Sequence, residues 1–281
     1  MIEIIKAVIF GIIEGITEWL PISSTGHLIL VEKLITFNGV SEGFWSMFEV
    51  VIQLGAILAV VILFWNKIFP FKKKTDNGYA KEGVLSHVDK GIMTLWFKII
   101  TACLPAVVFV ALGLDDVCEE LFYNYFSVAI ALIVFGVAFI VIENMNKSRA
   151  SKINSLEDIT YKTALCIGLF QLIAAVFPGT SRSGATIIGA LLIGVSRTVA
   201  AEYTFFLAIP VMFGASLLKI IKFGLGFTPL EALLLVIGMA VAFTVSLIVI
   251  KFLMEYIKKH DFKVFGWYRI ILGALVIVLR P

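Results

Sequence analysis

Two polar segments interrupt apolar sequence and carry most of the side chains that could do chemistry. One extends from Gly11 to His27 and the other from Gly168 to Gly184. They align without gaps at a single offset of 157 residues, and each contains a proline followed by hydroxyl residues. Carboxylates, hydroxyls, an imidazole and a guanidinium are costly to place in hydrocarbon, so their presence there indicates a function. The repeated segments are therefore where a functional site is expected.

The first segment contains two acids, Glu14 and Glu18, whose i, i+4 spacing places both carboxylates on one face of a helix. Solvated acids on a surface helix are the simpler interpretation, but the apolar flanks Val8–Ile13 and Trp19–Ile22 leave little polar face for such a helix. Two carboxylates in a low-dielectric pocket repel each other unless one is protonated or a cation neutralises them. Oxygen ligands suit hard cations, so the pair predicts a metal site for Mg²⁺ or Ca²⁺.

Each proline is expected to end one helix, and the hydroxyl residues after it are expected to cap a second helix. A helix N-terminus with free N–H groups, small residues and an arginine fork is suited to binding phosphate. The expected phosphate-binding residues are Ser23, Thr25 and Gly26 in the first segment and Thr180, Ser181, Ser183 and Gly184 in the second. Caps without a ligand would explain the hydroxyls alone, but they would leave Arg182 as a buried, unpaired cation.

The first segment ends on His27, the only histidine in apolar surroundings. A lone histidine is more often structural, but this one follows a serine-rich turn in the same hairpin, which favours a functional role. Ser24 or His27 could activate water or attack phosphorus, and the residues leave this choice open. We expect Glu18, Ser24, His27 and Arg182 to be the catalytic residues.

The composition is that of a membrane protein: 60% of the residues are hydrophobic, 15% are charged and the mean hydropathy is +1.02. An ordinary soluble domain has about 25% charged residues. The three cysteines are widely spaced and predict neither disulfides nor a thiolate metal site, and a net charge of +3 is too small to indicate nucleic-acid binding. Six apolar segments approach spanning length, namely Phe44–Trp65, Leu95–Leu114, Tyr125–Ile142, Tyr203–Leu218, Ala232–Ile250 and the shorter Phe265–Leu279.

Basic residues between the apolar segments predict the orientation in the membrane. The lysine- and arginine-rich connections are residues 66–81, which include Lys72, Lys73, Lys74 and Lys81, residues 144–162 and residues 258–263. The positive-inside rule places them in the cytoplasm. Both termini are then outside, the hairpin around Pro21 enters from the outside, and the hairpin around Pro178 enters from the cytoplasm.

Each hairpin is too polar at its centre to span cleanly and precedes three apolar segments, so both are predicted to be re-entrant helix-turn-helix hairpins. We predict an all-α polytopic membrane protein with six transmembrane helices and two re-entrant hairpins in an inverted-topology repeat. Residues 1–281 would form one integral membrane domain, with a first half at 1–143, a cytoplasmic linker at 144–159 and a second half at 160–281. The similarity of residues 96–100 to residues 267–271 suggests that the repeat continues to its last span.

Three stretches, Glu14–His27, Phe48–Gly55 and Phe177–Thr186, resemble the bacterial undecaprenyl-pyrophosphate phosphatases of the bacitracin-resistance type, and the resemblance covers nearly the whole chain. It implies a multi-pass protein of the bacterial plasma membrane with an active site on the extracytoplasmic side. The implied reaction is hydrolysis of a C55 isoprenoid pyrophosphate to its monophosphate, which recycles the cell-wall lipid carrier. The family motifs map onto Glu14 and Glu18, Ser24 and His27, and Ser181, Arg182 and Ser183.

The competing hypothesis is a transporter that flips a lipid phosphate, because an inverted repeat with two re-entrant hairpins would equally suggest one. The halves differ, however: Glu14 aligns with Gln171 and His27 with Gly184, while the arginine is found only in the second segment. This asymmetry favours a divided catalytic site. A passive channel would need a ring of repeated charges, which the sequence lacks. The sequence leaves a homodimer open.

Overall fold

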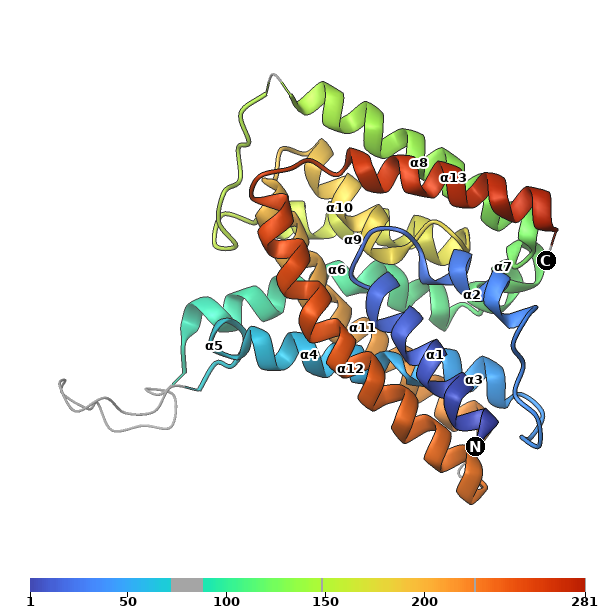
Figure 1. Ribbon diagram of the computed structural model, residues 1–281. Helices are drawn as coiled ribbons and strands as arrows, with labels where there is room; N and C mark the ends of the chain where they lie inside the picture. Colours follow the sequence, from blue (N-terminus) through green and yellow to red (C-terminus); the bar gives the residue numbers. More distant parts are fainter. Residues whose placement is uncertain (72–87, 148, 225, 281) are drawn as a thin grey trace.

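The computed structural model describes residues 1–71, 88–147, 149–224 and 226–280. In these residues the regular structure is helical, and β-pairing is limited to two isolated bridges, which confirms the all-α prediction (Figure 1). The helices are α1 (Ile2–Thr17), α2 (Ser24–Glu32), α3 (Phe44–Val51), α4 (Gln53–Leu63), α5 (Trp65–Ile68), α6 (Lys90–Ala111), α7 (Leu114–Phe122), α8 (Tyr125–Asn146), α9 (Tyr161–Val176), α10 (Arg182–Leu192), α11 (Arg197–Phe223), α12 (Pro229–Ile257) and α13 (Lys263–Leu279).

Five of the described helical segments are long and apolar enough to cross a membrane. They are α3 and α4 together, α6, α8, α11 and α12. Each coincides with one of the predicted apolar segments. The sixth predicted segment falls in α13, which has 17 residues and is therefore about 25 Å long, somewhat less than a hydrocarbon core of about 30 Å.

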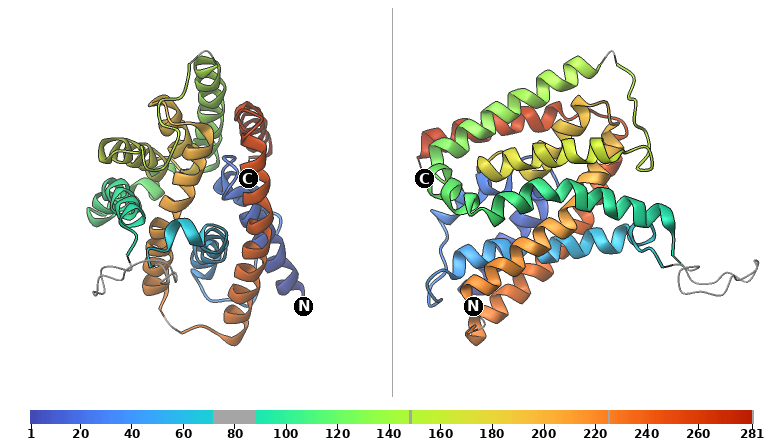
Figure 2. Two further views of the ribbon diagram at one scale, coloured as in Figure 1. Left: turned by 90° about the vertical axis from the view of Figure 1, so that its left-hand side faces the viewer. Right: turned by 180° about the vertical axis from the view of Figure 1, so that it is seen from behind.

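The connections divide between two ends of the molecule. Figures 1 and 2 show α5, the α8–α9 connection and the α12–α13 turn at one end, and α7 with both chain termini at the other. The basic residues at 147–152 and 258–263 lie at the first end, as the sequence predicted. The lysines at 72–74 and 81 lie outside the described residues.

The two hairpins occupy equivalent places against different helices. Helix α1 of the first hairpin packs along α12, and helix α9 of the second hairpin packs along α6. Glycines allow this close approach: a Cβ at Gly11 would lie 2.7 Å from the Gly238 carbonyl oxygen, and one at Gly168 would lie 2.2 Å from that of Ala102. Thus α6, the second long helix after the first hairpin, packs on the second hairpin, and α12, the second long helix after the second hairpin, packs on the first. Helices α8 and α13 pack on each other.

This packing corrects one detail of the predicted repeat. Residues 96–100 lie in α6, the second long helix after the first hairpin, whereas residues 267–271 lie in α13, the third after the second hairpin. Their similarity therefore does not mark equivalent positions. The division of the chain into halves at residues 143 and 160 stays a prediction.

Candidate active site

Each hairpin turn ends on a serine whose backbone is left-handed and whose side chain caps the next helix. The Ser23 Oγ accepts a hydrogen bond from the Gly26 N–H at 3.3 Å, and the Ser181 Oγ accepts one from the Gly184 N–H at 3.2 Å. Their φ values are 75° and 69°, which residues with a Cβ adopt only where the surroundings enforce them. The prediction of hydroxyl caps after both prolines is confirmed.

The caps show that the second turn is one residue longer than the first. Ser23 corresponds to Ser181 and Gly26 to Gly184, which gives an offset of 158 residues instead of 157. The additional residue is accommodated at Gly179, whose φ of 91° is rarely adopted by other residues. The gapless alignment is therefore wrong beyond the prolines.

The corrected register changes which side chains are equivalent. Arg182 begins α10 just as Ser24 begins α2, and His27 corresponds to Ala185, not to Gly184. Matching helix N-termini thus carry a guanidinium in one hairpin and a hydroxyl in the other. The chemical asymmetry that favours a divided catalytic site remains.

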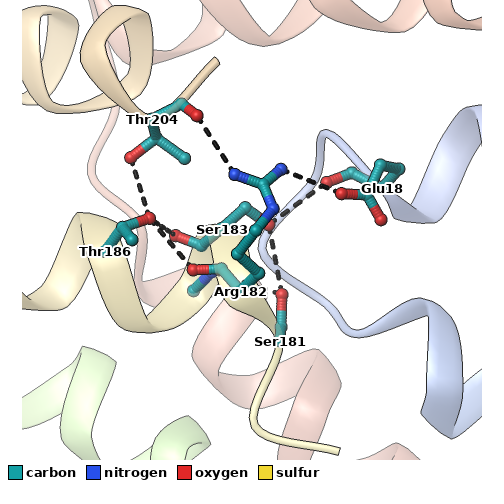
Figure 3. Close-up of polar contacts among 7 residues, drawn as sticks. Glu18, Ser181, Arg182, Ser183, Thr186 and Thr204 are labelled. Atoms are coloured by element: carbon teal, nitrogen blue, oxygen red, sulfur yellow. Dashed lines mark hydrogen bonds and ion pairs between the residues drawn. The ribbon is translucent and has the colours of Figure 1, made fainter. Parts of the chain in front are cut away.

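Arg182 reaches across to the first hairpin (Figure 3). Its Nη2 donates to Glu18 Oε1 at 2.9 Å, and its Nη1 donates to the Thr204 carbonyl oxygen at 3.1 Å. The side chains of Arg182 and Glu18 are 14% and 9% exposed, so the ion pair lies largely out of water. The expectation that Arg182 would be unpaired without a ligand is wrong, because Glu18 neutralises it.

Hydroxyl groups extend this contact into α10 and α11. The Ser183 Oγ donates to the Glu18 carbonyl oxygen at 3.2 Å and lies 3.1 Å from the Ser181 Oγ. One turn further on, Thr186 and Thr204 share a hydrogen bond of 2.9 Å between their hydroxyls. The N-terminus of α10 is thereby fixed against the end of α1, with the guanidinium held between them.

Glu14 lies next to this pair but has no hydrogen-bond partner in the described structure. Its side chain is fully buried, and both carboxylate oxygens lack a partner. It interacts electrostatically with Glu18, Glu49 and Arg182, so these charges lie near one another. At the equivalent position of the second hairpin, the buried Gln171 amide also lacks partners among the described residues. Glu49 was missed from the sequence, although a carboxylate inside an apolar helix was the signal.

Both ring nitrogens of His27 have a hydrogen-bond partner. Nδ1 lies 2.7 Å from the Ser23 carbonyl oxygen, and Nε2 lies 2.7 Å from the Tyr268 hydroxyl, on whose ring the imidazole also stacks. Because a carbonyl only accepts, Nδ1 carries the proton, and in a neutral imidazole Nε2 accepts from Tyr268. In the described structure no hydrogen bond joins Ser24, Thr25 or His27 to Glu18 or Arg182.

A second arginine, Arg269 on α13, ties the two turns together. Nη1 donates to the Pro21 carbonyl oxygen at 3.3 Å, and Nη2 donates to those of Gly179 and Thr180 at 3.0 and 2.7 Å. The side chain is fully buried. Sequence reasoning missed this residue, although a cation within the apolar segment 265–279 was as strong a signal as Arg182.

The chain matches one protein family over most of its length. The family described as bacitracin resistance protein BacA matches residues 7–275. The chain belongs to this family. Its matched region includes both hairpins and the helices that support them.

Curated relatives named undecaprenyl-diphosphatase include proteins of Desulfitobacterium hafniense (62% identity, covering 99% of this chain and 96% of the relative) and Enterococcus faecalis (60%, covering 99% and 97%). A relative from Clostridium acetobutylicum, named undecaprenyl-diphosphatase 1, is 62% identical over 99% of this chain and 97% of its own length.

Arg269→Lys tests whether the two turns depend on the hydrogen bonds that Arg269 donates to their carbonyl oxygens. One ammonium cannot reproduce the guanidinium's three contacts, and each buried carbonyl left without a donor costs about 1–3 kcal/mol. We expect the midpoint of thermal unfolding to fall by roughly 4–12 °C. The control is Arg280→Lys at the exposed end of the same helix, which should leave the midpoint unchanged. Equal midpoints for the two variants would contradict the structural role of Arg269.

Proposed function

We propose that this protein is an undecaprenyl-diphosphatase that hydrolyses undecaprenyl pyrophosphate to undecaprenyl phosphate and inorganic phosphate. Its relatives carry that name, and the family name supports a contribution to bacitracin resistance. The observation that carries the proposal is the pairing of Glu18 with Arg182 between two capped helix N-termini. In the net reaction water supplies the oxygen added to the terminal phosphorus, and the bond from that phosphorus to the bridging oxygen breaks. If Ser24 or His27 attacks first, water then hydrolyses the phosphoryl-enzyme and frees the side chain.

The substrate's phosphoryl groups would bind where the two hairpin turns face each other. Arg182 offers a planar fork, and the N-termini of α2 and α10 offer backbone N–H groups and positive dipole ends. The hydroxyls and small residues of both turns would complete the binding site, namely Ser23, Thr25, Gly26, Thr180, Ser181, Ser183 and Gly184. The buried Thr180 Oγ1, which has no partner in the described structure, is available to a ligand. The isoprenoid chain would remain in the lipid along the spans.

The nucleophile is proposed to be Ser24 or water, with His27 as the general base, or His27 itself. Ser24 and His27 lie three residues apart on α2 and are therefore neighbours on one face of the helix. The Ser23 carbonyl fixes the imidazole so that Nε2 is the accepting nitrogen. The Tyr268 hydroxyl now occupies Nε2, so the base would become active when substrate or water displaces that contact.

The acids are proposed to hold a divalent cation, Mg²⁺ or Ca²⁺. Glu14 fits this role because its two buried oxygens lack partners in the described structure, and Glu18 lies beside it. The described residues contain no group of three or more His, Cys, Asp or Glu side chains suited to a metal. Mg²⁺ is often held by one or two carboxylates together with substrate phosphates. A bound cation would neutralise pyrophosphate charge beside the carboxylates.

In the membrane we propose six transmembrane helices, with α13 as the sixth, and two re-entrant hairpins that enter from opposite sides. The site would open toward the end that carries α7. Polar side chains continue in that direction, because Glu49 interacts electrostatically with Glu14 and with Glu32, Glu119 and Lys219. The opposite end carries the basic connections, so the site would face the extracytoplasmic side of the plasma membrane. All these residues come from one chain, and a homodimer stays a prediction.

Replacing Arg182 tests the proposed reaction. Removing one preorganised oxyanion donor typically costs about 2.7–4 kcal/mol at the transition state, and by the same reasoning Arg182→Ala should lower kcat by about 100- to 1000-fold. Arg182→Lys keeps the charge opposite Glu18 but loses the fork, so it should fold and still be impaired. The measurement is phosphate release from undecaprenyl pyrophosphate by purified protein in detergent.

Arg280→Ala, at an exposed arginine, is the control and should retain full phosphate release. Release by Arg182→Ala within about threefold of the unaltered protein would remove this residue from the site. If the unaltered protein released no phosphate but moved the lipid across vesicles, a transporter would be the better description.

Glu14→Gln tests the cation. The amide keeps the shape but not the charge, so we expect the Mg²⁺ or Ca²⁺ concentration for half-maximal phosphate release to rise at least about tenfold. Glu42→Gln, at an exposed acid in the α2–α3 connection, is the matched control. An unchanged cation requirement, or full activity in the presence of a chelator, would contradict the metal proposal.

Cysteine labelling tests the orientation. In a variant whose three native cysteines are replaced by serine, Asp116→Cys on α7 should react with a membrane-impermeant maleimide on intact cells. Lys259→Cys in the α12–α13 turn should react only after the membrane is opened. The reverse labelling pattern would place the site on the cytoplasmic side.

A further inference from the structure

A polar cavity lies at the opposite end of α10 from the proposed active site. It has a volume of about 650 Å³ and is bounded by the ends of α8, α10 and α12, the start of α11 and the connection at residues 149–152. Arg182 and Leu192 mark the two ends of α10, so the cavity lies about 15 Å along the helix axis from the guanidinium site. Figure 1 shows this end on the side of the α8–α9 connection, where the basic connections gather.

Positive charge dominates the walls of this cavity. Four basic residues line it, Arg149, Lys152, Arg197 and Lys258, against a single acid, Glu143. The fully buried Glu143 is already satisfied, because Arg197 Nε donates to it at 2.9 Å and its Oε1 accepts from the Phe262 N–H at 3.0 Å. Glu143 therefore neutralises Arg197 and not the other three cations.

The two cations of the connection lack a carboxylate partner in the described structure. Lys258 is paired with Glu255 at 2.6 Å, whereas no ion pair joins Arg149 or Lys152 to an acid among the described residues. Like charges facing one cavity repel each other unless an anion lies between them. The cavity therefore favours an anionic ligand.

The wall that carries these cations is fixed to the hairpin by backbone hydrogen bonds. The N–H groups of Lys152 and Ile153 donate to the Gly194 carbonyl oxygen at 2.8 and 3.1 Å, and the Ser196 N–H donates to the Ile153 carbonyl oxygen at 2.9 Å. The Lys152 side chain lies along Gly194, whose φ of 91° turns the chain from α10 into α11. The site is thus built into the fold rather than carried by a free loop.

Backbone donors add to the same cavity. Ser196 is the N-cap of the 27-residue helix α11 but makes no side-chain cap hydrogen bond. The first residues of α11, Arg197 and Thr198, also line the cavity. Their N–H groups have no acceptor within the helix, and the positive end of the helix dipole points the same way.

We propose that this cavity binds a phosphate group, carried either by an anionic phospholipid at the membrane surface or by free inorganic phosphate. Guanidinium, ammonium and helix N-terminal N–H groups together are the donors that recognise phosphate oxygens. Basic pockets between membrane helices are suited to anionic lipid headgroups. The apolar residues Leu191, Leu192, Ile193 and Ile257 complete the lining and suit the first carbons of the acyl chains of such a lipid.

The test is binding to the purified full-length protein by native mass spectrometry with short-chain phosphatidylglycerol and phosphatidylcholine, and by calorimetry with inorganic phosphate. The variant Arg149→Ala/Lys152→Ala should lose about 10- to 100-fold in affinity for the anionic probe, because two charge-assisted contacts are removed. The matched control Lys162→Ala/Lys259→Ala removes two exposed lysines that do not line the cavity and should bind as the unaltered protein does.

The charge-preserving variant Arg149→Lys/Lys152→Arg should keep most of the binding, which separates loss of charge from misfolding. Weakened phosphatidylglycerol binding alone would identify a lipid headgroup, and weakened inorganic phosphate binding would identify free phosphate. Equal affinity of the alanine double variant and the control for every anionic probe would overturn the proposal. Phosphatidylcholine bound as tightly as phosphatidylglycerol, together with inorganic phosphate binding that the alanine double variant leaves unchanged, would also overturn it.

Discussion

The ion pair between Glu18 and Arg182 joins the two hairpins through residues that are 164 positions apart in the chain. Each charge alone would be expensive to bury, and removing one partner of such a pair typically costs about 3–5 kcal/mol. A change in the position of one turn would therefore leave the charged side chain on the other turn without its partner. The hydroxyl contact from Ser183 to the Glu18 carbonyl oxygen and the bond from Arg182 to the Thr204 carbonyl oxygen keep the pair in one arrangement. The same arrangement places Arg182, at the N-terminus of α10, beside Glu18 at the end of α1.

Arg269 has the complementary role on the backbone side. Its guanidinium supplies donors to carbonyls of both turns, which have left the helical hydrogen-bond pattern at their prolines. One arginine of α13 thus holds the turns, while the arginine of α10 is presented toward the acids. Close glycine contacts of α1 with α12 and of α9 with α6 position the arms that carry these turns. The proposed catalytic groups would then be divided between two hairpins that are held in place by the same contacts.

The sequence predicted those parts of this arrangement that depend on local chemistry. Prolines and hydroxyls predicted the two capped turns, the acid spacing predicted a shared helix face, and hydropathy predicted the long helices. The register beyond the prolines could not be predicted, because the additional residue is absorbed by the positive φ of Gly179, which is a property of the backbone. Long-range partners were also missed: the contacts of His27 with Tyr268 and of Arg182 with Glu18 join residues 241 and 164 positions apart.

The central claim is that Glu18 and Arg182 act as one unit divided between two hairpins, and a double-mutant cycle tests it most directly. The measurement is kcat/KM for phosphate release by Glu18→Gln, Arg182→Gln and the double variant, with unfolding midpoints recorded for each. Residues that act as a unit are strongly non-additive, so the double variant should be no more than about threefold worse than the poorer single variant. If the two losses multiply instead, the residues act independently and the account of a shared site is contradicted.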